Sequence, residues 1–212
     1  MCCLDLIFPG YSPLKKQNKN NSIASKHCMQ KTKLYILLVL ITTFSVSLIH
    51  PGIYISSTGT ISFRSDAPLE LIGASSKELK GAIDTDKKTF AFKIRIRSFQ
   101  GFNSPLQREH FNENYLESEK YQEAAFTGKI IEDINFNVPG KYSIRAKGIL
   151  SIHGIDQERI IKSELEIREN SILIKSSFIV LLNDHKILIP KVVSEKLANE
   201  IKVDLSAELL PK

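Results

Sequence analysis

Cysteine is scarce in this 212-residue chain, and its three cysteines all lie before residue 34. The rest of the chain therefore folds without a disulfide bond, and no cysteine follows the long apolar run to carry a lipoprotein-type anchor. No histidine or fourth cysteine completes a zinc-ligand pattern with Cys2, Cys3 and Cys28. We expect no metal and no cofactor.

An excess of charge of one sign is also missing from most of the chain. The formal net charge is +6, but six lysines and a single acidic residue, Asp5, precede residue 34. The remainder is nearly neutral. A lysine cluster ahead of an apolar run is typical of a topology signal that keeps the N-terminus in the cytoplasm. The charge therefore gives no support for a nucleic-acid partner.

The sequence lacks a catalytic signature as well. The histidines after residue 50 fall in separate expected elements, and structural roles are favoured for them: His110, His153 and His185. Four acidic residues share one segment with asparagine and lysine, which is typical of a solvated helix surface: Glu109, Glu113, Glu117 and Glu119. No glycine-rich phosphate loop and no nucleophile elbow is present. We therefore expect that the protein is not an enzyme.

An apolar, uncharged run at residues 34–49 follows a polar, basic segment at residues 1–33. The run is shorter than the about 20 residues of a spanning helix, so it predicts either a signal-peptide core or an uncleaved anchor. We expect a periplasmic or otherwise exported protein. If the signal is uncleaved, the inner membrane is a partner of the N-terminus. Met29 precedes Lys31 and Lys33, the short positive segment of such a signal, and is an alternative start of the chain.

Alternation of apolar and polar residues with a period of two dominates residues 53–209. It predicts nine strands, at residues 53–63, 69–73, 78–83, 89–99, 126–136, 141–152, 158–167, 172–182 and 201–209. Short, turn-rich connections indicate an antiparallel meander, and closure into a barrel removes its exposed edges. Two short helices are expected, one at residues 104–118 after the capping box of Ser104 and Gln107, and one at residues 191–200.

Large apolar side chains share the parity that faces the inside of such a barrel: Phe90, Phe92, Ile94, Ile96, Tyr142 and Ile144. A barrel of about eight strands is either filled by side chains or wide enough for one slender ligand. The pattern leaves both alternatives open, a tunnel for an alkyl or isoprenoid chain and an ordinary dry core.

Three sequence blocks resemble the YceI-like family over residues 53–209. They are the segment from His110 to Tyr121, the segment from Gly148 to Gly154, and the segment from Ile187 to Ile201. The chain departs from the family pattern at Gln122, where the family has proline. The resemblance implies an exported, extended antiparallel barrel similar to that of lipocalins, which holds a polyisoprenoid lipid and has no assigned catalytic residue.

Two hypotheses about function follow. The first is an exported protein that holds a long-chain lipid or isoprenoid in the barrel, with His110, Phe111 and Tyr115 on a helical loop near its mouth. The alternative is an exported structural or interaction module with a solid core, whose helical loop docks a partner. A homodimer is compatible with either. The identity of the lipid and the choice between carrying, storing and sensing it stay open.

Overall fold

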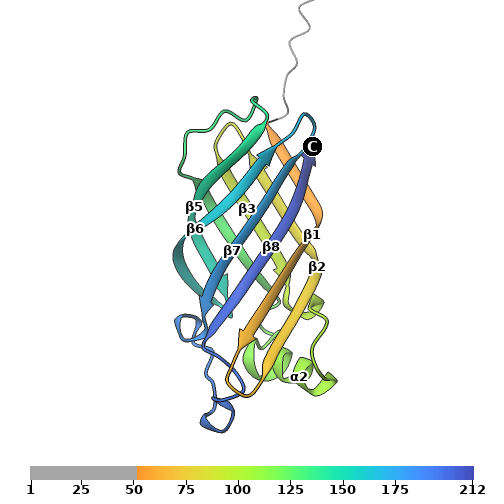
Figure 1. The fold of residues 1–212 in the computed structure, drawn as a ribbon, viewed down its shortest axis with the longest axis vertical. Coiled ribbons are helices and arrows are strands. Elements are labelled where there is room, and N and C mark those ends of the chain that lie inside the picture. Colours follow the sequence, from red (N-terminus) through yellow and green to blue (C-terminus); the bar gives the residue numbers. More distant parts are fainter. Residues whose placement is uncertain (1–51) are drawn as a thin grey trace, which may run out of the picture. The chain divides into compact units, whose positions relative to one another are not determined.

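A computed structural model describes residues 52–212 of the chain, which form one closed antiparallel barrel (Figure 1). Its eight strands are β1 (Ile53–Asp66), β2 (Leu71–Asp84), β3 (Thr89–Arg95), β4 (Glu123–Ile130), β5 (Gly140–Ile152), β6 (Ile155–Ile167), β7 (Ile172–Leu181) and β8 (Glu200–Pro211). Each strand pairs with the next in sequence, and β8 closes the sheet onto β1. The predicted all-β barrel is confirmed.

Short helical segments fill the connections: the 3₁₀ turns η1 (Ile96–Ser98), η3 (Leu182–His185) and η4 (Lys191–Val193), the helix α2 (Pro105–His110) and the π-helical turn η2 (Phe111–Tyr115). The predicted start of α2 is confirmed, because the Ser104 hydroxyl accepts a hydrogen bond from the Gln107 amide at 3.2 Å. Within residues 52–212, no helix is both long and apolar enough to cross a membrane.

The alternation read from the sequence sorts side chains between the two faces of the barrel. In β3, Phe90, Phe92 and Ile94 are buried inside, and the residues between them are exposed. Charged side chains on the outside form cross-strand pairs such as Lys93 with Glu123. Exposed pairs of this kind contribute little stability, about 0–1 kcal/mol each, so burial of the inner face is what holds the sheet closed.

The expectation of nine strands is wrong, because the strands predicted at residues 69–73 and 78–83 are parts of the single strand β2, which begins at Leu71. The polar stretch between them resembles a turn in the sequence, yet it stays in the sheet and pairs with β1 across register shifts. Ser76 is buried and its hydroxyl lies 2.7 Å from that of Ser98, so the buried polar group has a partner.

Two predicted strands also extend too far along the chain. The strand expected at residues 89–99 ends at Arg95, because the backbone turns into η1, although Ile96 stays buried. The strand expected at residues 126–136 begins earlier, at Glu123, and ends at Ile130. Phe136 is buried from the loop that follows, which gave the segment its strand-like apolar pattern.

The second predicted helix, at residues 191–200, is absent from the structure and is replaced by η4 and irregular turns. Some of its backbone amides bond to carbonyls within the segment, as in short turns, and other backbone groups bond outside it. The Glu195 carbonyl accepts from the Leu69 amide at 2.9 Å, and the Ala198 amide donates to the Ser65 hydroxyl at 2.9 Å. Tertiary hydrogen bonds to the β1–β2 turn therefore override the helical periodicity of the sequence.

Two glycines allow β4 and β5 to approach closely. Gly128 and Gly148 are directly paired, and a Cβ on either would lie 2.1 Å from a backbone oxygen of the other strand. Register continues unbroken through Gly148, and Leu150 beyond it is buried like Ala146 before it. Gly148 therefore marks a close contact between strands and no bulge.

We expect Gly148→Ala to destabilise the barrel by about 1–3 kcal/mol, because the new methyl group meets backbone that cannot rotate away. Urea unfolding followed by circular dichroism measures the loss. Gly73→Ala is the matched control, since its Cβ would meet only the Phe63 carbonyl oxygen at 3.4 Å. Equal stability of the two variants would show that β4 and β5 can separate without cost.

Candidate functional site: the cavity inside the barrel

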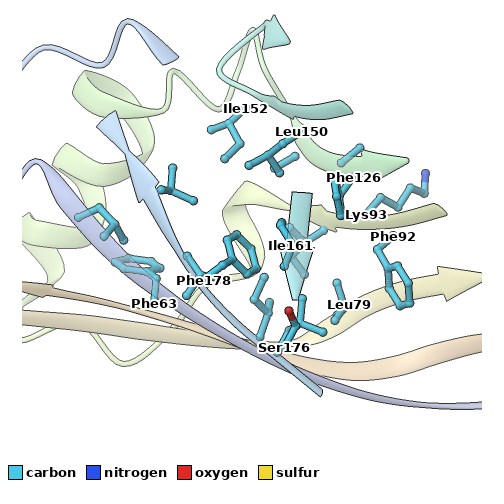
Figure 2. A pocket seen from close by; sticks show the side chains of 18 of the residues that line it. Phe63, Leu79, Phe92, Lys93, Phe126, Leu150, Ile152, Ile161, Ser176 and Phe178 are labelled. Carbon is cyan, nitrogen blue, oxygen red and sulfur yellow. The ribbon is translucent and has the colours of Figure 1, made fainter. Parts of the chain in front are cut away.

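A cavity of about 200 Å³ runs inside the barrel between side chains from all eight strands. Figure 2 shows side chains such as Leu79, Phe126 and Phe178 converging on it from different strands. One water molecule needs only about 10–15 Å³ of such space, so the cavity exceeds an ordinary packing defect. The interior is therefore not packed solid.

Hydrocarbon makes up nearly all of the cavity wall. Four of its lining residues carry a polar side chain: Lys93, Tyr115, Ser163 and Ser176. The Lys93 ammonium points away and pairs with Glu123 on the outside, at 3.1 Å from both carboxylate oxygens. The Ser163 hydroxyl donates to that of Ser176, which donates to a backbone carbonyl. The wall therefore offers a ligand no charge and few free hydrogen-bonding groups.

Most of the strand residues that the sequence predicts to line a tunnel do face this cavity. Phe90, Phe92, Ile94, Ile96 and Ile144 line it. Tyr142 does not. Its side chain packs on the core, and its hydroxyl donates to the Val138 carbonyl at 3.0 Å, which holds the ring against the loop after β4.

The helical loop contributes two of its three predicted residues to the cavity. Phe111 and Tyr115 line it, whereas His110 is exposed and does not. Phe111 stacks on Phe63 with ring centroids 5.2 Å apart and meets Phe99 edge-on at 5.8 Å. Aromatic rings from β1, the η1 region and η2 thus close the barrel at this position.

Sequence reasoning missed the opposite wall. It is formed by residues of β5 to β8 and of the loop before β8, among them Leu150, Ile161, Ile174, Phe178, Ile187, Leu197 and Val203. Residues of β1, β2 and β4 also line the cavity and were likewise missed. Period-two alternation could have identified the lining residues that lie in strands, because buried and exposed positions alternate in β6, β7 and β8 as they do in β3. Ile187 and Leu197 lie in irregular segments, where no periodicity identifies them.

Four residues of the first two family-like blocks meet at one end of the barrel and do not line the cavity, although Phe111 and Leu150 of the same blocks do. His153 and Gly154 form the two-residue β5–β6 turn, both with positive φ, which suits a type I′ hairpin. The His153 ring contacts Tyr121 edge-on, with its Nε2 2.6 Å from a Glu117 carboxylate oxygen. A Cβ on Gly154 would lie 2.4 Å from the Tyr121 ring. These four residues fasten the loop after η2 onto the β5–β6 turn.

His185 connects the contact between the loop after η2 and the β5–β6 turn to the core of the barrel. It is fully buried, its Nδ1 donates to the Ile155 carbonyl at 3.2 Å, and its backbone carbonyl accepts from His153 Nδ1 at 3.1 Å. Among the described residues, nothing hydrogen-bonds to its Nε2. Burial lowers the pKa of His185, because the charged imidazolium would lose its hydration. Residues 52–212 contain no group of three potential metal ligands around it.

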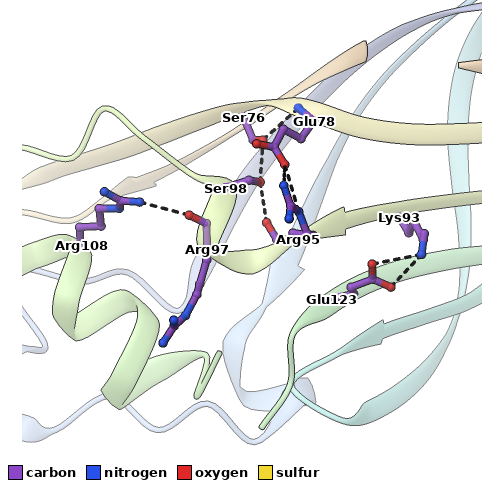
Figure 3. A network of polar contacts seen from close by, with 8 residues as sticks. All are labelled: Ser76, Glu78, Lys93, Arg95, Arg97, Ser98, Arg108 and Glu123. Carbon is purple, nitrogen blue, oxygen red and sulfur yellow. Dashed lines mark hydrogen bonds and ion pairs between the residues drawn. The ribbon is translucent and has the colours of Figure 1, made fainter. Parts of the chain in front are cut away.

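A polar groove on the outer surface is a weaker candidate site. Figure 3 shows its network, in which Arg95 pairs with Glu78 and Ser98 bonds to Ser76. Arg97 likewise pairs with Glu119. Since these arginines already have carboxylate partners on the protein, the groove presents no free positive charge from them to an anion.

A closed barrel around a hydrocarbon-lined cavity is the architecture of residues 52–212, and comparisons with known proteins identify the family to which it belongs. The model of the YceI-like domain matches residues 55–209, so the chain belongs to the YceI-like family. None of the curated proteins matches the chain.

Solved structures share the fold at low sequence identity. A polyisoprenoid-binding domain from Saccharophagus degradans, implicated in plant cell wall breakdown, superposes with a TM-score of 0.64 at 13% identity, over 76% of this chain and 99% of its own. BcnA from Burkholderia cenocepacia gives 0.59 at 13% identity, over 71% and 95%. A mutant CJ YceI protein made for nanotechnology applications gives 0.52 at 16% identity, over 65% and 83%.

Burial of neutral His185 predicts a pH dependence of stability. The unfolded chain takes up a proton below about pH 6.5, whereas folded His185 resists protonation until a lower pH. The contribution of neutral His185 to the free energy of unfolding is therefore fully present above pH 6.5. It is lost as the pH falls toward the lowered pKa, by at most about 1.4 kcal/mol per pH unit. Urea unfolding between pH 5 and pH 7.5, at fixed salt concentration, measures the slope.

We expect His185→Leu to flatten this slope, and the exposed His110→Gln control to leave it unchanged. The slope, and not the absolute stability, is the relevant quantity, because His185→Leu also removes the hydrogen bond to Ile155. An unchanged slope in His185→Leu would contradict the assignment.

Proposed function

We propose that the protein binds a long-chain apolar lipid, of which a polyisoprenoid is the leading candidate, inside the barrel. The observation that carries the proposal is the hydrocarbon-lined cavity in a closed barrel. Each methylene group that moves from water into such a site contributes about 0.8 kcal/mol, so a chain of several isoprene units gains enough affinity without any polar contact. The polyisoprenoid binding of the Saccharophagus degradans domain, which has the same fold, supports the choice of ligand.

Cavity size bears on how the ligand binds. An apolar cavity of about 150 Å³ can stay dry and accept a molecule as small as benzene. The cavity here, of about 200 Å³, accepts a short apolar segment as it stands. A longer chain needs lining side chains such as Phe126 and Phe178 to change rotamer along its path. The cavity weighs against the alternative of an interaction module with a solid core.

The absence of a catalytic role is part of the same proposal. The wall carries no charge, its two serine hydroxyls bond to the protein, and no charged side chain of the lining is placed to activate the remaining polar residue, Tyr115. The lining therefore holds no acid–base pair and no activated nucleophile for a reaction on a bound lipid. A binding protein needs none of these.

We expect Phe92→Asp and Ile94→Asp to lose lipid retention. Both side chains line the cavity, and a carboxylate there would be buried without a partner. Native mass spectrometry of protein purified without detergent measures the co-purified lipid. Ala91→Asp is the matched control, because this neighbour on β3 is exposed and should retain lipid.

A variant without a new charge separates loss of the site from loss of the fold. Ala146→Leu adds apolar bulk to the cavity wall and should lower retention while the barrel stays folded by circular dichroism. If wild-type protein carries no lipid and takes up none from added polyisoprenoid, the proposed function is wrong. If Phe92→Asp and Ile94→Asp fold and still retain lipid, the ligand does not lie against β3.

We also propose that the protein is exported, with residues 34–49 as signal core or anchor. These residues lie outside the part of the chain that the structure describes. The lysines before the apolar run and the cysteine-free remainder support the proposal. The N-terminal mass of the protein from cell fractions tests it: a start after residue 45 in the periplasm is expected for cleavage, and a membrane-bound full-length chain for anchoring. Full-length protein in the soluble cytoplasmic fraction would contradict export.

A further inference from the structure

The most exposed large apolar side chains of the described residues lie at one end of the barrel (Figure 1). Among the described residues, the three most exposed large hydrophobic side chains are Val192, Leu188 and Leu69, at 89%, 79% and 66% exposure. Leu69 lies in the turn between β1 and β2, and the other two lie in the loop before β8. We name residues 67–70 and 186–197 together the barrel tip.

The two segments of the barrel tip form one surface, although more than a hundred residues separate them in the sequence. The Leu69 amide donates to the Glu195 carbonyl at 2.9 Å, and the next residues on each side are tied by the bond from the Ala198 amide to Ser65. Figure 1 shows both segments at the end of the barrel opposite the C-terminus. The apolar side chains therefore share one end of the molecule.

Positive charge accompanies these side chains. Lys186, Lys191 and Lys196 are exposed in the same loop, and none forms an ion pair with another residue in the described range 52–212. The acidic residues of the barrel tip are Glu70 and Glu195, which leaves a positive balance. Exposed apolar groups flanked by lysines match the interface of an anionic bilayer. The acyl chains of the lipids accept the apolar side chains, and the anionic headgroups attract the lysines.

The barrel tip also adjoins the cavity. Ile187 is buried and lines the cavity, and its neighbour Leu188 faces outward. Leu197 lines the cavity from the other end of the same loop. A loop with one face in the cavity and the other on a lipid surface gives a lipid chain a short path between the two.

We propose that the barrel tip docks onto an anionic lipid bilayer, with Leu69, Leu188 and Val192 entering the interface and the three lysines contacting lipid phosphates. The proposal rests on the lipid-binding function and specifies where the ligand is exchanged.

The absence of tryptophan from the chain allows a site-specific test. Val192→Trp places a single fluorophore at the barrel tip, and Ile160→Trp places one on the exposed outer wall of β6 as control. Full-length variants are mixed with phosphatidylglycerol–phosphatidylcholine vesicles in which all acyl chains are brominated quenchers. We expect a blue shift and quenching for Val192→Trp and neither for Ile160→Trp. Because the probe is local, contacts of residues 34–49 with the vesicles do not mimic the signal.

Charge variants test the lysines. In the Val192→Trp background, Lys191→Gln should raise the lipid concentration for half-quenching about fivefold, the contribution of one basic residue near an anionic surface. Lys175→Gln, at an exposed position on β7, should leave it unchanged. High salt should act like loss of the lysines.

Several outcomes would overturn the proposal: no quenching of Val192→Trp, quenching equal to that of Ile160→Trp, or equal quenching by pure phosphatidylcholine. A shift that follows protein concentration instead of lipid would assign the barrel tip to self-association. Lipid retention by native mass spectrometry is measured on the same variant. Retention without docking rejects this proposal alone, whereas failure to bind any lipid rejects the function beneath it.

Discussion

Closure of the sheet is the constraint on which the rest of the structure depends. Because β8 pairs with β1, no strand has a free edge, and every strand must place alternate side chains inside. The inside of an eight-stranded barrel is narrow enough that the size of those side chains decides whether it is filled. Gly128 and Gly148 allow β4 and β5 to lie close together. The aromatic rings of Phe63 and Phe111 close the interior near η2. The cavity is the space that remains between these contacts.

Family-like residues and cavity residues play different parts in this molecule. Glu117, Tyr121, His153 and Gly154 made the sequence recognisable, yet they contact one another and not the cavity. Their junction fixes the loop that carries Phe111 and Tyr115, which do line it. The family-like blocks therefore identify how the end of the barrel is built, and most of the cavity wall beyond them is marked by parity and apolar character alone. This explains why fold is easier to infer than ligand.

The alternation of apolar and polar residues predicted the features of the barrel that depend on neighbouring residues in the sequence. Residues of β3 alternate because one face of the strand is exposed to solvent and the other is buried, so the sequence predicted the burial of Phe90, Phe92 and Ile94. Long-range contacts decided the rest. Residues 191–200 carry helical spacing, but two of their backbone groups bond to Leu69 and Ser65 instead of continuing a helix. The contact of His153 with Glu117 joins residues 36 apart in sequence, and no spacing rule anticipates it. Likewise Tyr142 has inward parity, yet its hydroxyl is held by the loop at Val138.

The small number of polar groups in the cavity limits the orientations in which the proposed ligand can bind. A headgroup drawn inside would lose its hydrogen bonds to water, and the serine pair, already bonded to the protein, offers little in return. An amphiphile must therefore enter tail first and leave its head at an end of the barrel. At the barrel tip, one loop has side chains on both sides of that boundary, with Ile187 on the cavity and Lys186 and Leu188 in the solvent. Selectivity then rests on chain length and shape more than on polar contacts, because few polar groups line the wall.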